Sequence, residues 1–324
     1  MKLVQKLLNK FNGLKYPQEY LCLAHESFQQ PLYAYLVQNH KVIKDITKLH
    51  SFVGYCPLIF ALSSSAGISP EQENIDIVFS ATPLQANVFF WEKDALALLS
   101  LKKIHEQSLN GDTVVYYEGN IGKHRFISSF YQFIGQLNNR LYNRKPGNVF
   151  LEDNLYKQVQ IGYAIPRKIS LITVGHNNLY NHFPTDLHGQ VNDEYYIISL
   201  RHEGAACRQV ENAQKIVLSD MKASAFKQTY ALGKNHMQPL KEASAFNFSA
   251  MHSKCWQLPL PNNALSYKEL QLEDSFTHGI HKLLLFRMVG HEQLNEESGT
   301  LVHIHNVYAT WRHKKGIAGN YFLR

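Results

Sequence analysis

The sequence has no apolar run of the roughly 20 residues that a helix needs to cross a bilayer. Residues 1–11, MKLVQKLLNKF, alternate Lys with apolar residues, which predicts a short amphipathic helix rather than the unbroken apolar core of a signal peptide. Cysteine is scarce, and its four positions form no C-x-x-C pair: Cys22, Cys56, Cys207 and Cys255. This spacing argues against a zinc ribbon or a redox dithiol. We therefore expect a cytoplasmic protein with reduced thiols and no membrane partner.

Charged residues are also few, at 18% of the chain, although the balance is basic, with a formal net charge of +7 and a pI near 9.0. A basic balance is compatible with binding to nucleic acid, to anionic lipid or to a phosphate-bearing ligand. Lys and Arg are spread thinly, however, and the nearest approach to a basic run is Arg312-His313-Lys314-Lys315. A solvated basic surface is the preferred interpretation, and we expect no nucleic-acid partner.

Several signatures of catalysis are missing. The sequence contains neither the G-x-S-x-G motif of serine hydrolases nor the G-x-G-x-x-G dinucleotide fingerprint. The segment from Gly119 to Lys123 lacks the spacing of a P-loop, and we interpret it as a turn that begins a helix. His303-Ile304-His305 offers only two imidazoles, so no metal site is expected. Arg208 could activate the adjacent thiol of Cys207, but a small buried residue at a turn is the preferred interpretation.

The first half of the chain combines strands with helices. Tyr and Phe, at 18 residues each, favour strands and aromatic-lined pockets. Apolar and β-branched runs predict strands at residues 31–38, 57–63, 74–81, 87–92 and 113–119. Helical spacing predicts helices at residues 93–109 and 123–144. Pro146-Gly147 ends the second helix and predicts a domain junction, which gives a mixed α+β domain of unknown role at residues 1–150.

The second half, residues 151–324, is mostly strand-like. Strands are predicted at residues 168–175, 194–201, 214–221, 282–294 and 299–311, with one helix at residues 223–233. Several strands joined by short turns indicate a barrel or a sandwich. The predicted fold class is therefore α+β, with a mixed N-terminal domain and a β-rich C-terminal domain.

The stretch ITVGHNNLYNHFPTDLHG, residues 172–189, places many hydrogen-bonding side chains just after an apolar strand. We interpret residues 176–185 as a loop that leaves this strand. Such a loop can supply polar donors and acceptors, and Phe183 and Pro184 can give it stiff apolar walls. The residues alone leave two readings open, a capped surface loop, which is the simpler one, and a loop that binds a ligand.

From Tyr163 to Lys315 the chain resembles the flavin reductase-like family, which folds as an FMN-binding split β-barrel. The similarity lies in strand order and loop chemistry: Pro166 before the strand that carries Thr173, the polar segment 178–185, the IISLR strand 197–201, the segment CRQVENAQKIVLSD at 207–220, His281 before LLLFRMVG, and Tyr308 in the last strand. The chain departs from the family at Cys207-Arg208, where a threonine is usual. The first half has no counterpart in the single-domain members.

The resemblance implies an FMN-binding oxidoreductase of the flavin reductase type. In that family NAD(P)H binds transiently and passes hydride to the flavin, and the protein is a homodimer. The residues that the resemblance places at the cofactor are Thr173, Asn178, Asn181, His182, Phe183, Pro184, Thr185, Ser199, Leu200, Arg201, Cys207, Arg208, Gln209 and Val210. Arg201 and Arg208 are the candidates for the phosphate, because a guanidinium group can bind phosphate through two parallel hydrogen bonds. No catalytic side chain is assigned, and a flavin-binding or sensing protein without turnover is the alternative.

Overall fold

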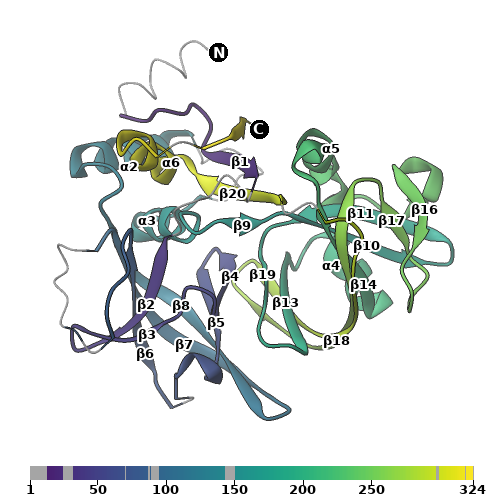
Figure 1. The fold of residues 1–324 in the computed structure, drawn as a ribbon, viewed down its shortest axis with the longest axis horizontal. Coiled ribbons are helices and arrows are strands. Elements are labelled where there is room, and N and C mark those ends of the chain that lie inside the picture. The colour runs from purple at the N-terminus through teal and green to yellow at the C-terminus, as the bar shows by residue number, and fades with distance from the viewer. Residues whose placement is uncertain are drawn as a thin grey trace. The chain divides into compact units, whose positions relative to one another are not determined.

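The computed structural model describes residues 13–24, 32–69, 71–86, 88, 95–142, 150–296, 299–317 and 319–323 (Figure 1). The predicted N-terminal amphipathic helix, Pro146-Gly147 and all but residue 88 of the predicted strand 87–92 lie outside the described residues. The chain divides into two compact units. The first contains the described residues of Met1–Leu21, Phe28–Ile165 and Ile304–Gly319, and the second those of Cys22–Ser27, Pro166–His303 and Asn320–Arg324.

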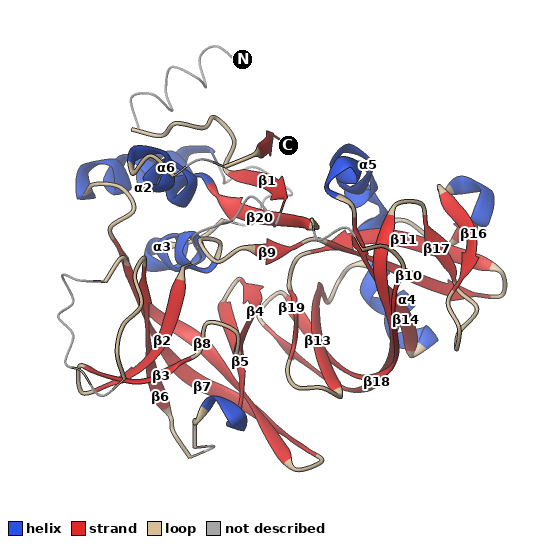
Figure 2. Cartoon of the chain, in the orientation of Figure 1, coloured by secondary structure: helices blue, strands red, loops and turns tan. Residues whose placement is uncertain are grey.

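The first unit is built on a seven-stranded antiparallel sheet in the order β3-β2-β6-β7-β8-β5-β4 (Figure 2). Its strands are β2 (Tyr33–Gln38), β3 (Lys41–Asp45), β4 (His50–Tyr55), β5 (Leu58–Ser63), β6 (Asn74–Ser80), β7 (Ala97–Leu109) and β8 (Asp112–His124). The strands predicted at residues 31–38, 57–63, 74–81 and 113–119 are confirmed. Each of them carries apolar side chains that the sheet buries on at least one face.

A long antiparallel hairpin of β7 and β8 replaces the helix predicted at residues 93–109, so that prediction is wrong. β7 pairs with β6 on one side and with β8 on the other. Ala97, Leu99 and Leu101 are buried in alternation, which is the period of a strand. The segment's Ala, Leu and Lys residues are good helix formers, but intrinsic propensity is small and pairing with two neighbouring strands outweighs it.

The segment from Gly119 to Lys123 lies inside β8 and is not the predicted turn before a helix. Helix α3 (Asp153–Gly162) packs against this strand, and its Gln158 donates a hydrogen bond to the carbonyl oxygen of Asn120 at 3.1 Å. A Cβ atom on Gly122 would lie 2.8 Å from the Cγ atom of Gln158. Glycine is therefore present because a helix approaches the strand closely.

Helices complete the first unit. The helix predicted at residues 123–144 is confirmed only from Ser129, where α2 (Ser129–Tyr142) begins. The strand predicted at residues 299–311 ends early, because β20 (Leu301–His305) is followed by α6 (Asn306–Lys314). The imidazole of His305 caps this helix by accepting a hydrogen bond from the backbone amide of Val307 at 3.2 Å. Tyr308, expected in the last strand, therefore lies in a helix.

The second unit is built on an eight-stranded antiparallel sheet in the order β12-β13-β19-β18-β14-β10-β11-β15. Its strands are β10 (Ser170–His176), β11 (Leu179–Thr185), β12 (His188–Gln190), β13 (Tyr195–Arg201), β14 (Lys215–Met221), β15 (Lys241–Glu242), β18 (Ala264–His278) and β19 (His281–Gln293). The strands predicted at residues 168–175, 194–201, 214–221 and 282–294 are confirmed. The order ends at β12 and β15, so the sheet formed by the described strands is open.

Short elements connect and extend these sheets. Helices α4 (Ala205–Ala213) and α5 (Phe226–Ala231) belong to the second unit, and α5 confirms part of the helix predicted at residues 223–233. A 3₁₀ helix, η5 (Leu232–Met237), follows α5 directly. The remaining strands are β1 (Tyr20–Ala24), β9 (Arg167–Lys168) and β21 (Tyr321–Leu323), which join β20 in a four-stranded sheet, and the pair β16 (Phe248–His252) and β17 (Pro259–Pro261). The protein is thus a mixed α and β structure made mostly of strands.

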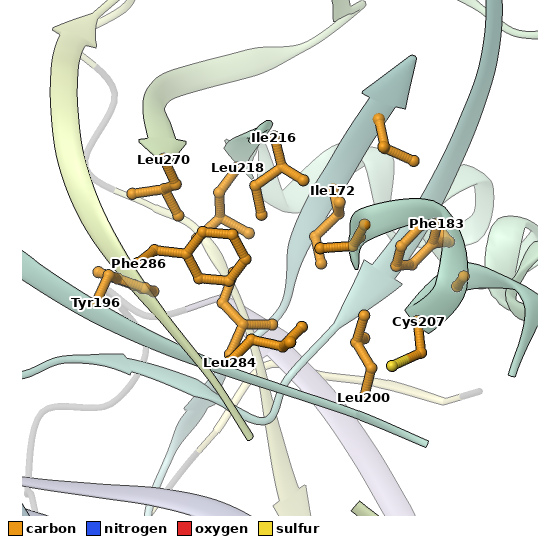
Figure 3. Close-up of a cluster of buried hydrophobic side chains, with 14 residues drawn as sticks. Ile172, Phe183, Tyr196, Leu200, Cys207, Ile216, Leu218, Leu270, Leu284 and Phe286 are labelled. Carbon is orange, nitrogen blue, oxygen red and sulfur yellow. The ribbon is translucent and has the colours of Figure 1, made fainter. Parts of the chain in front are cut away.

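The core of the second unit lies on one face of its eight-stranded sheet. The cluster draws side chains from β10, β11, β13, β14, β18, β19 and α4, and Figure 3 shows them converging. The residues labelled in it are Ile172, Phe183, Tyr196, Leu200, Cys207, Ile216, Leu218, Leu270, Leu284 and Phe286. On β14 the alternate residue Val217 belongs to a different cluster, with Tyr267. A strand places successive side chains on opposite faces, and this period fixes which residues of β14 reach the core.

Candidate functional site

The polar stretch 176–185, interpreted from the sequence as a loop, is a β-hairpin, so that interpretation is wrong. β11 pairs with β10 in antiparallel register, with Thr173 opposite His182. The connection is Asn177-Asn178, whose φ angles of 51° and 59° are left-handed. Two-residue hairpin turns need positive φ at both positions, and Asn tolerates this better than most residues. Of the predicted cofactor contacts, only Asn178 stays on the exposed turn.

Asn181 and Gln209, both predicted to contact the cofactor, are brought together but bind each other. The Nδ2 atom of Asn181 donates to Oε1 of Gln209 at 2.7 Å and to the carbonyl oxygen of Asn235 at 3.0 Å. The Nδ2 atom of Asn235, in turn, donates to the carbonyl oxygen of His182 at 2.8 Å. These bonds fasten β11 to α4 and η5. Their role is structural, because a buried amide needs partners and finds them inside the fold.

Thr173 and His182 form a second internal pair. The Oγ1 atom of Thr173 lies 3.0 Å from Nδ1 of His182, and both side chains are buried. Burial lowers the pKa of His182 to about 4, so its imidazole is neutral near pH 7. The ring of Phe248 meets it edge-on at 5.2 Å. This pair fixes the hairpin to the core rather than facing a ligand.

Four further predicted contacts, Phe183, Leu200, Cys207 and Val210, belong to the apolar core of Figure 3. Burial, followed by the charge of Glu211, raises the pKa of the Cys207 thiol to about 12. The thiol is therefore protonated and unsuited to nucleophilic attack, which supports its interpretation as a small buried residue. Thr185 is also buried, at the end of β11, while the half-buried Pro184 accepts a hydrogen bond through its carbonyl oxygen from Nε2 of His236 at 2.7 Å.

Positive charge gathers where β13 ends and α4 begins. We call residues 201–208 the basic turn; its Arg201, His202, Glu203 and Arg208 are exposed, and a guanidinium nitrogen of Arg208 donates to the carbonyl oxygen of Glu203 at 3.1 Å. α4 starts after Gly204, and no side chain caps its first turn. A Cβ atom on Gly204 would lie 3.1 Å from the carbonyl oxygen of Arg201, so this turn is tight. The first-turn amide groups of a helix attract anions, and two arginines beside them add to that attraction.

The pKa of a buried histidine, His281, is lowered by its burial and by the positive charges of the basic turn. The Nδ1 atom of His281 lies 3.0 Å from Oγ of Ser199, a predicted contact that is buried too. Burial first, and then the charges of Arg201 and His202, lower the pKa of His281 to about 3. One nearby carboxylate, that of Glu211, is engaged by Nζ of Lys282 at 2.9 Å. The basic turn is thus an electrostatically favourable place for an anionic group.

A second polar group contains residues that the sequence did not single out as partners. The Nδ1 atom of His303 lies 2.6 Å from Oδ2 of Asp186, and the Nε2 atom of His303 is hydrogen-bonded to the hydroxyl of Tyr230. We call Tyr230, His303 and Asp186 the proton chain. His303 was noted as part of a possible metal pair, but Tyr230 and Asp186 come from α5 and from the end of β11. Their proximity could not be read from spacing along the chain.

The electrostatics of the proton chain define its hydrogen bonds. Burial raises the pKa of Asp186, but the hydrogen bond and charge of His303 and the charge of Arg167 outweigh this, so the pKa lies below its usual value. Asp186 is therefore a carboxylate that accepts a hydrogen bond from Nδ1 of His303. With the ring proton on Nδ1, the Nε2 atom of His303 accepts a hydrogen bond from the hydroxyl of Tyr230. This arrangement can take up or release a proton at the tyrosine hydroxyl.

His236 lies between the basic turn and the proton chain. Burial is the main reason that its pKa is lowered, while Asp186 raises this pKa and Arg201 lowers it further. Its carbonyl oxygen lies 3.6 Å from the position of a Cβ atom on Gly204, and its ring packs on Phe183 with centroids 4.8 Å apart. His236 is thus close enough to both polar groups to be influenced by the charges of Asp186 and Arg201.

The first unit holds a cavity of about 370 Å³. It is lined by Val37, Asn39, His40, Asp76, Leu98, Ser100, Ile121 and Lys123. Oγ of Ser100 donates to Oδ1 of Asp76 at 2.6 Å within it. None of the predicted cofactor contacts lies in this lining.

Two other features bear on the expectations from the sequence. Within the described ranges, no group of three or more His, Cys, Asp or Glu side chains is placed to hold a metal ion. His305 instead faces Glu19, with Nε2 3.4 Å from Oε1. Among the helices that the structure describes, none is long and apolar enough to cross a membrane.

Comparison with known proteins gives limited matches. No family model matches the sequence, and no curated protein matches it. Solved structures of flavin proteins align with part of the chain. The NADH:FAD oxidoreductase of Streptomyces globisporus C-1027 is 12% identical, with 49% of this chain and 94% of that chain covered and a TM-score of 0.41.

Two more structures give similar values. The flavin reductase component of a bacterial two-component tryptophan halogenase is 13% identical, covers 52% of this chain and 98% of its own, and has a TM-score of 0.41. The FMN-binding protein from Thermus thermophilus with bound 1-cyclohex-2-enone is 17% identical, covers 40% of this chain and 71% of its own, and has a TM-score of 0.35. Similarity at this level assigns the chain neither a fold family nor a function.

Proposed function

We propose that this chain is a flavin-binding oxidoreductase and that the basic turn holds the phosphate of FMN. The observation that carries the proposal is the coincidence of Arg201, Arg208 and the uncapped first turn of α4. A flavin phosphate carries two negative charges on an extended polyol, so it needs convergent donors at one end of its site. Guanidinium groups and helix amides are donors of this kind.

The remaining predicted contacts take supporting roles in this proposal. Asn181 and Gln209 fix α4 to β11 through their mutual hydrogen bond at 2.7 Å, which holds the basic turn in place. Thr173, His182 and the apolar residues of Figure 3 form the floor beneath it. The ligand contacts thus reduce to Arg201, Arg208 and the backbone of the first turn of α4. Because the hairpin's polar groups are engaged internally, the flavin ring would lie on the surface that runs past His236.

A bound flavin would supply the hydride chemistry, with NAD(P)H as a transient co-substrate. The protein's own contribution is orientation and proton transfer. Arg201 and Arg208 anchor the anionic end, and His236 lies between this anchor and the proton chain. The hydroxyl of Tyr230 holds a proton at the site, while His303 and Asp186 stabilise its transfer. Assembly as a homodimer stays a prediction.

Titration with FMN tests the proposal. The purified full-length protein should quench flavin fluorescence at stoichiometric saturation. Because a hydrogen bond to a charged group contributes about 1.5–3 kcal/mol, Arg201→Ala and Arg208→Ala should each weaken FMN binding roughly 10-fold to 100-fold. Arg287→Ala is the matched control, because it removes the same charge from a half-exposed side chain whose partner is Glu273. A wild-type protein that takes up no FMN would overturn the proposal.

Consumption of NAD(P)H separates an enzyme from a binding protein. The FMN-loaded protein should oxidise NADH or NADPH when free flavin or oxygen is the acceptor. A protein that binds FMN but never consumes either nucleotide would be a flavin carrier or sensor instead.

A further inference from the structure

The core face of the second unit changes from apolar to charged along its strands. On β10, β14 and β18 the apolar residues Ile172, Leu218 and Leu270 belong to the core. Two residues along each strand, on the same face, are Ser170, Asp220 and Lys268. Asp220 lies opposite Ser170 on one side and opposite Ser266 on the other. We call this the polar end of the core face.

Asp220 is well satisfied at the polar end. Its carboxylate accepts from Oγ of Ser170 at 2.7 Å and from Nζ of Lys168 at 3.1 Å. Oγ of Ser266 lies 3.5 Å away. These donors leave Asp220 with little need for another cation.

Lys268 is not satisfied in the same way. Its Nζ atom lies 4.0 Å from Oδ2 of Asp220, beyond hydrogen-bonding distance, although only 13% of the lysine side chain is exposed. The ammonium group lies over the ring of Tyr196, 5.8 Å from the centroid. Among the residues that the structure describes, none accepts a hydrogen bond from it. A sheltered ammonium group without an acceptor is costly, so such a group needs a partner.

His188 presents a second unsatisfied donor. Its Nδ1 atom lies 2.7 Å from the hydroxyl of Tyr196, while its Nε2 atom is buried without a partner in the described part of the chain. Burial is the main reason that the pKa of His188 falls to about 3, so the ring is neutral. If Tyr196 donates to Nδ1, the hydroxyl proton and Nδ1 are both satisfied, and the ring proton sits on Nε2. The opposite tautomer would leave two groups unsatisfied instead of one.

Charge at the polar end is unbalanced. The side chains of Arg167, Lys168 and Lys268 carry three positive charges close to His188, and all three cations lower its pKa. Asp186 and Asp220 supply two carboxylates, which leaves an excess of one positive charge. A water molecule could satisfy Nε2 of His188, but it would not compensate this charge.

We propose that the polar end binds a small monovalent anion, with the ammonium group of Lys268 and the Nε2–H group of His188 as its donors. The chemical class is a halide or a compact oxyanion such as nitrate. Both donors contact Tyr196: the ammonium group of Lys268 lies over its ring, and His188 is hydrogen-bonded to its hydroxyl. A monovalent anion would accept from both donors and would balance the one uncompensated positive charge. The donors of this site are separate from those of the proposed flavin site, since they include neither Arg201 nor Arg208; Asp186 contributes its charge near both.

Bromide is the probe that tests this inference. A crystal of the full-length protein grown in sodium bromide should show an anomalous bromine peak within hydrogen-bonding distance of Nζ of Lys268 and Nε2 of His188. In solution, the Nε2–H resonance of His188 should move saturably with bromide at constant ionic strength. Ordered water without anomalous signal in the crystal, or a resonance that does not move, would overturn the proposal.

Paired lysine variants sharpen the result. Lys268→Met keeps the length of the side chain and should abolish the bromine peak and the saturable shift. Lys254→Met is the matched control, because it removes the same charge from a lysine that is 73% exposed and paired with Glu292, outside the charge balance of the polar end; it should retain the peak. Equal loss in both variants would mean that bromide responds only to general positive charge, which would contradict the assigned donors.

Discussion

The Nδ1 atom of His303 lies 2.6 Å from Oδ2 of Asp186, although 117 residues separate them in the chain. This bond holds the imidazole with its second nitrogen toward Tyr230. An imidazole fixed between a carboxylate and a hydroxyl has a defined tautomer. The pair therefore gives the tyrosine hydroxyl a specific acceptor for its proton.

The substitution Tyr230→Phe should slow turnover without weakening flavin binding. Loss of a positioned acid or base typically costs about 10²-fold or more in rate. We expect NAD(P)H oxidation by the FMN-loaded protein to fall by this factor and its pH profile to flatten. Tyr180→Phe is the matched control, since Tyr180 packs on Phe248 in the same unit. Unchanged kinetics in Tyr230→Phe would remove the proton chain from the mechanism.

The substitution Asn181→Ala should lower the stability of the fold rather than weaken FMN binding. It leaves Gln209 and the carbonyl oxygen of Asn235 without their donor. An unsatisfied buried polar group costs about 1–3 kcal/mol, and we expect the free energy of unfolding in urea to fall by this amount. Asn178→Gly, in the exposed turn at φ 59°, should change it by less than about 0.5 kcal/mol. If Asn181→Ala instead abolished FMN binding at unchanged stability, Asn181 would be a cofactor contact after all.

The substitution Phe286→Ala should be the most destabilising of these changes, because its side chain lies in the middle of the core cluster of Figure 3. Phe→Ala in a core typically costs about 3–5 kcal/mol. Leu179→Ala, on a side chain that is 39% exposed, serves as the control and should cost much less. Thermal and urea unfolding both measure this difference. A loss below about 1 kcal/mol for Phe286→Ala would indicate that the cluster is loosely packed.

Most strands were predictable because their apolar side chains recur at a strand period or in short apolar runs. β7 was misassigned because Ala, Leu and Lys dominate it, and only its pairing with β6 and β8 decides its structure. The hairpin of β10 and β11 had a local signal, Asn177-Asn178 between apolar residues, which the polar side chains around it obscured. The helix after His305 was missed because Val307, Tyr308 and Trp311 favour strands.

The candidate site was predictable only in part. Arg201 and Arg208 are close in sequence and flank a helix start, so their proximity follows from local structure. Tyr230, His303 and Asp186 come from three distant segments, and only tertiary folding brings them together. Residues such as Asn181 and His182 were polar for a different reason: they satisfy one another and the backbone in the interior.

Asp220 should make the stability of the second unit sensitive to acid. Burial raises its pKa, but Lys168, Lys268 and Ser170 outweigh this, so the folded-state pKa is well below the unfolded value near 4. A lowered folded-state pKa means that the carboxylate stabilises the fold above the unfolded value. That stabilisation is lost as the pH falls from about 5 through the folded-state pKa.

The substitution Asp220→Asn should therefore cost stability at neutral pH and little in acid. Removing one partner of a buried ion pair costs about 3 kcal/mol or more, and we expect this difference from the wild type at pH 7. Urea unfolding between about pH 2.5 and pH 7 should show the difference shrinking on acidification, because the carboxylate of the unfolded wild-type chain then takes up a proton while that of the folded chain does not. The buried histidines His182 and His281 add their own acid sensitivity, but they are present in both proteins and cancel in the comparison.

Asp193→Asn is the control; at its exposed position it should change stability by less than about 0.5 kcal/mol. A difference that stays constant over the whole pH range would show that the Asp220 charge does not stabilise the fold, and the two lysines would then be held by packing alone.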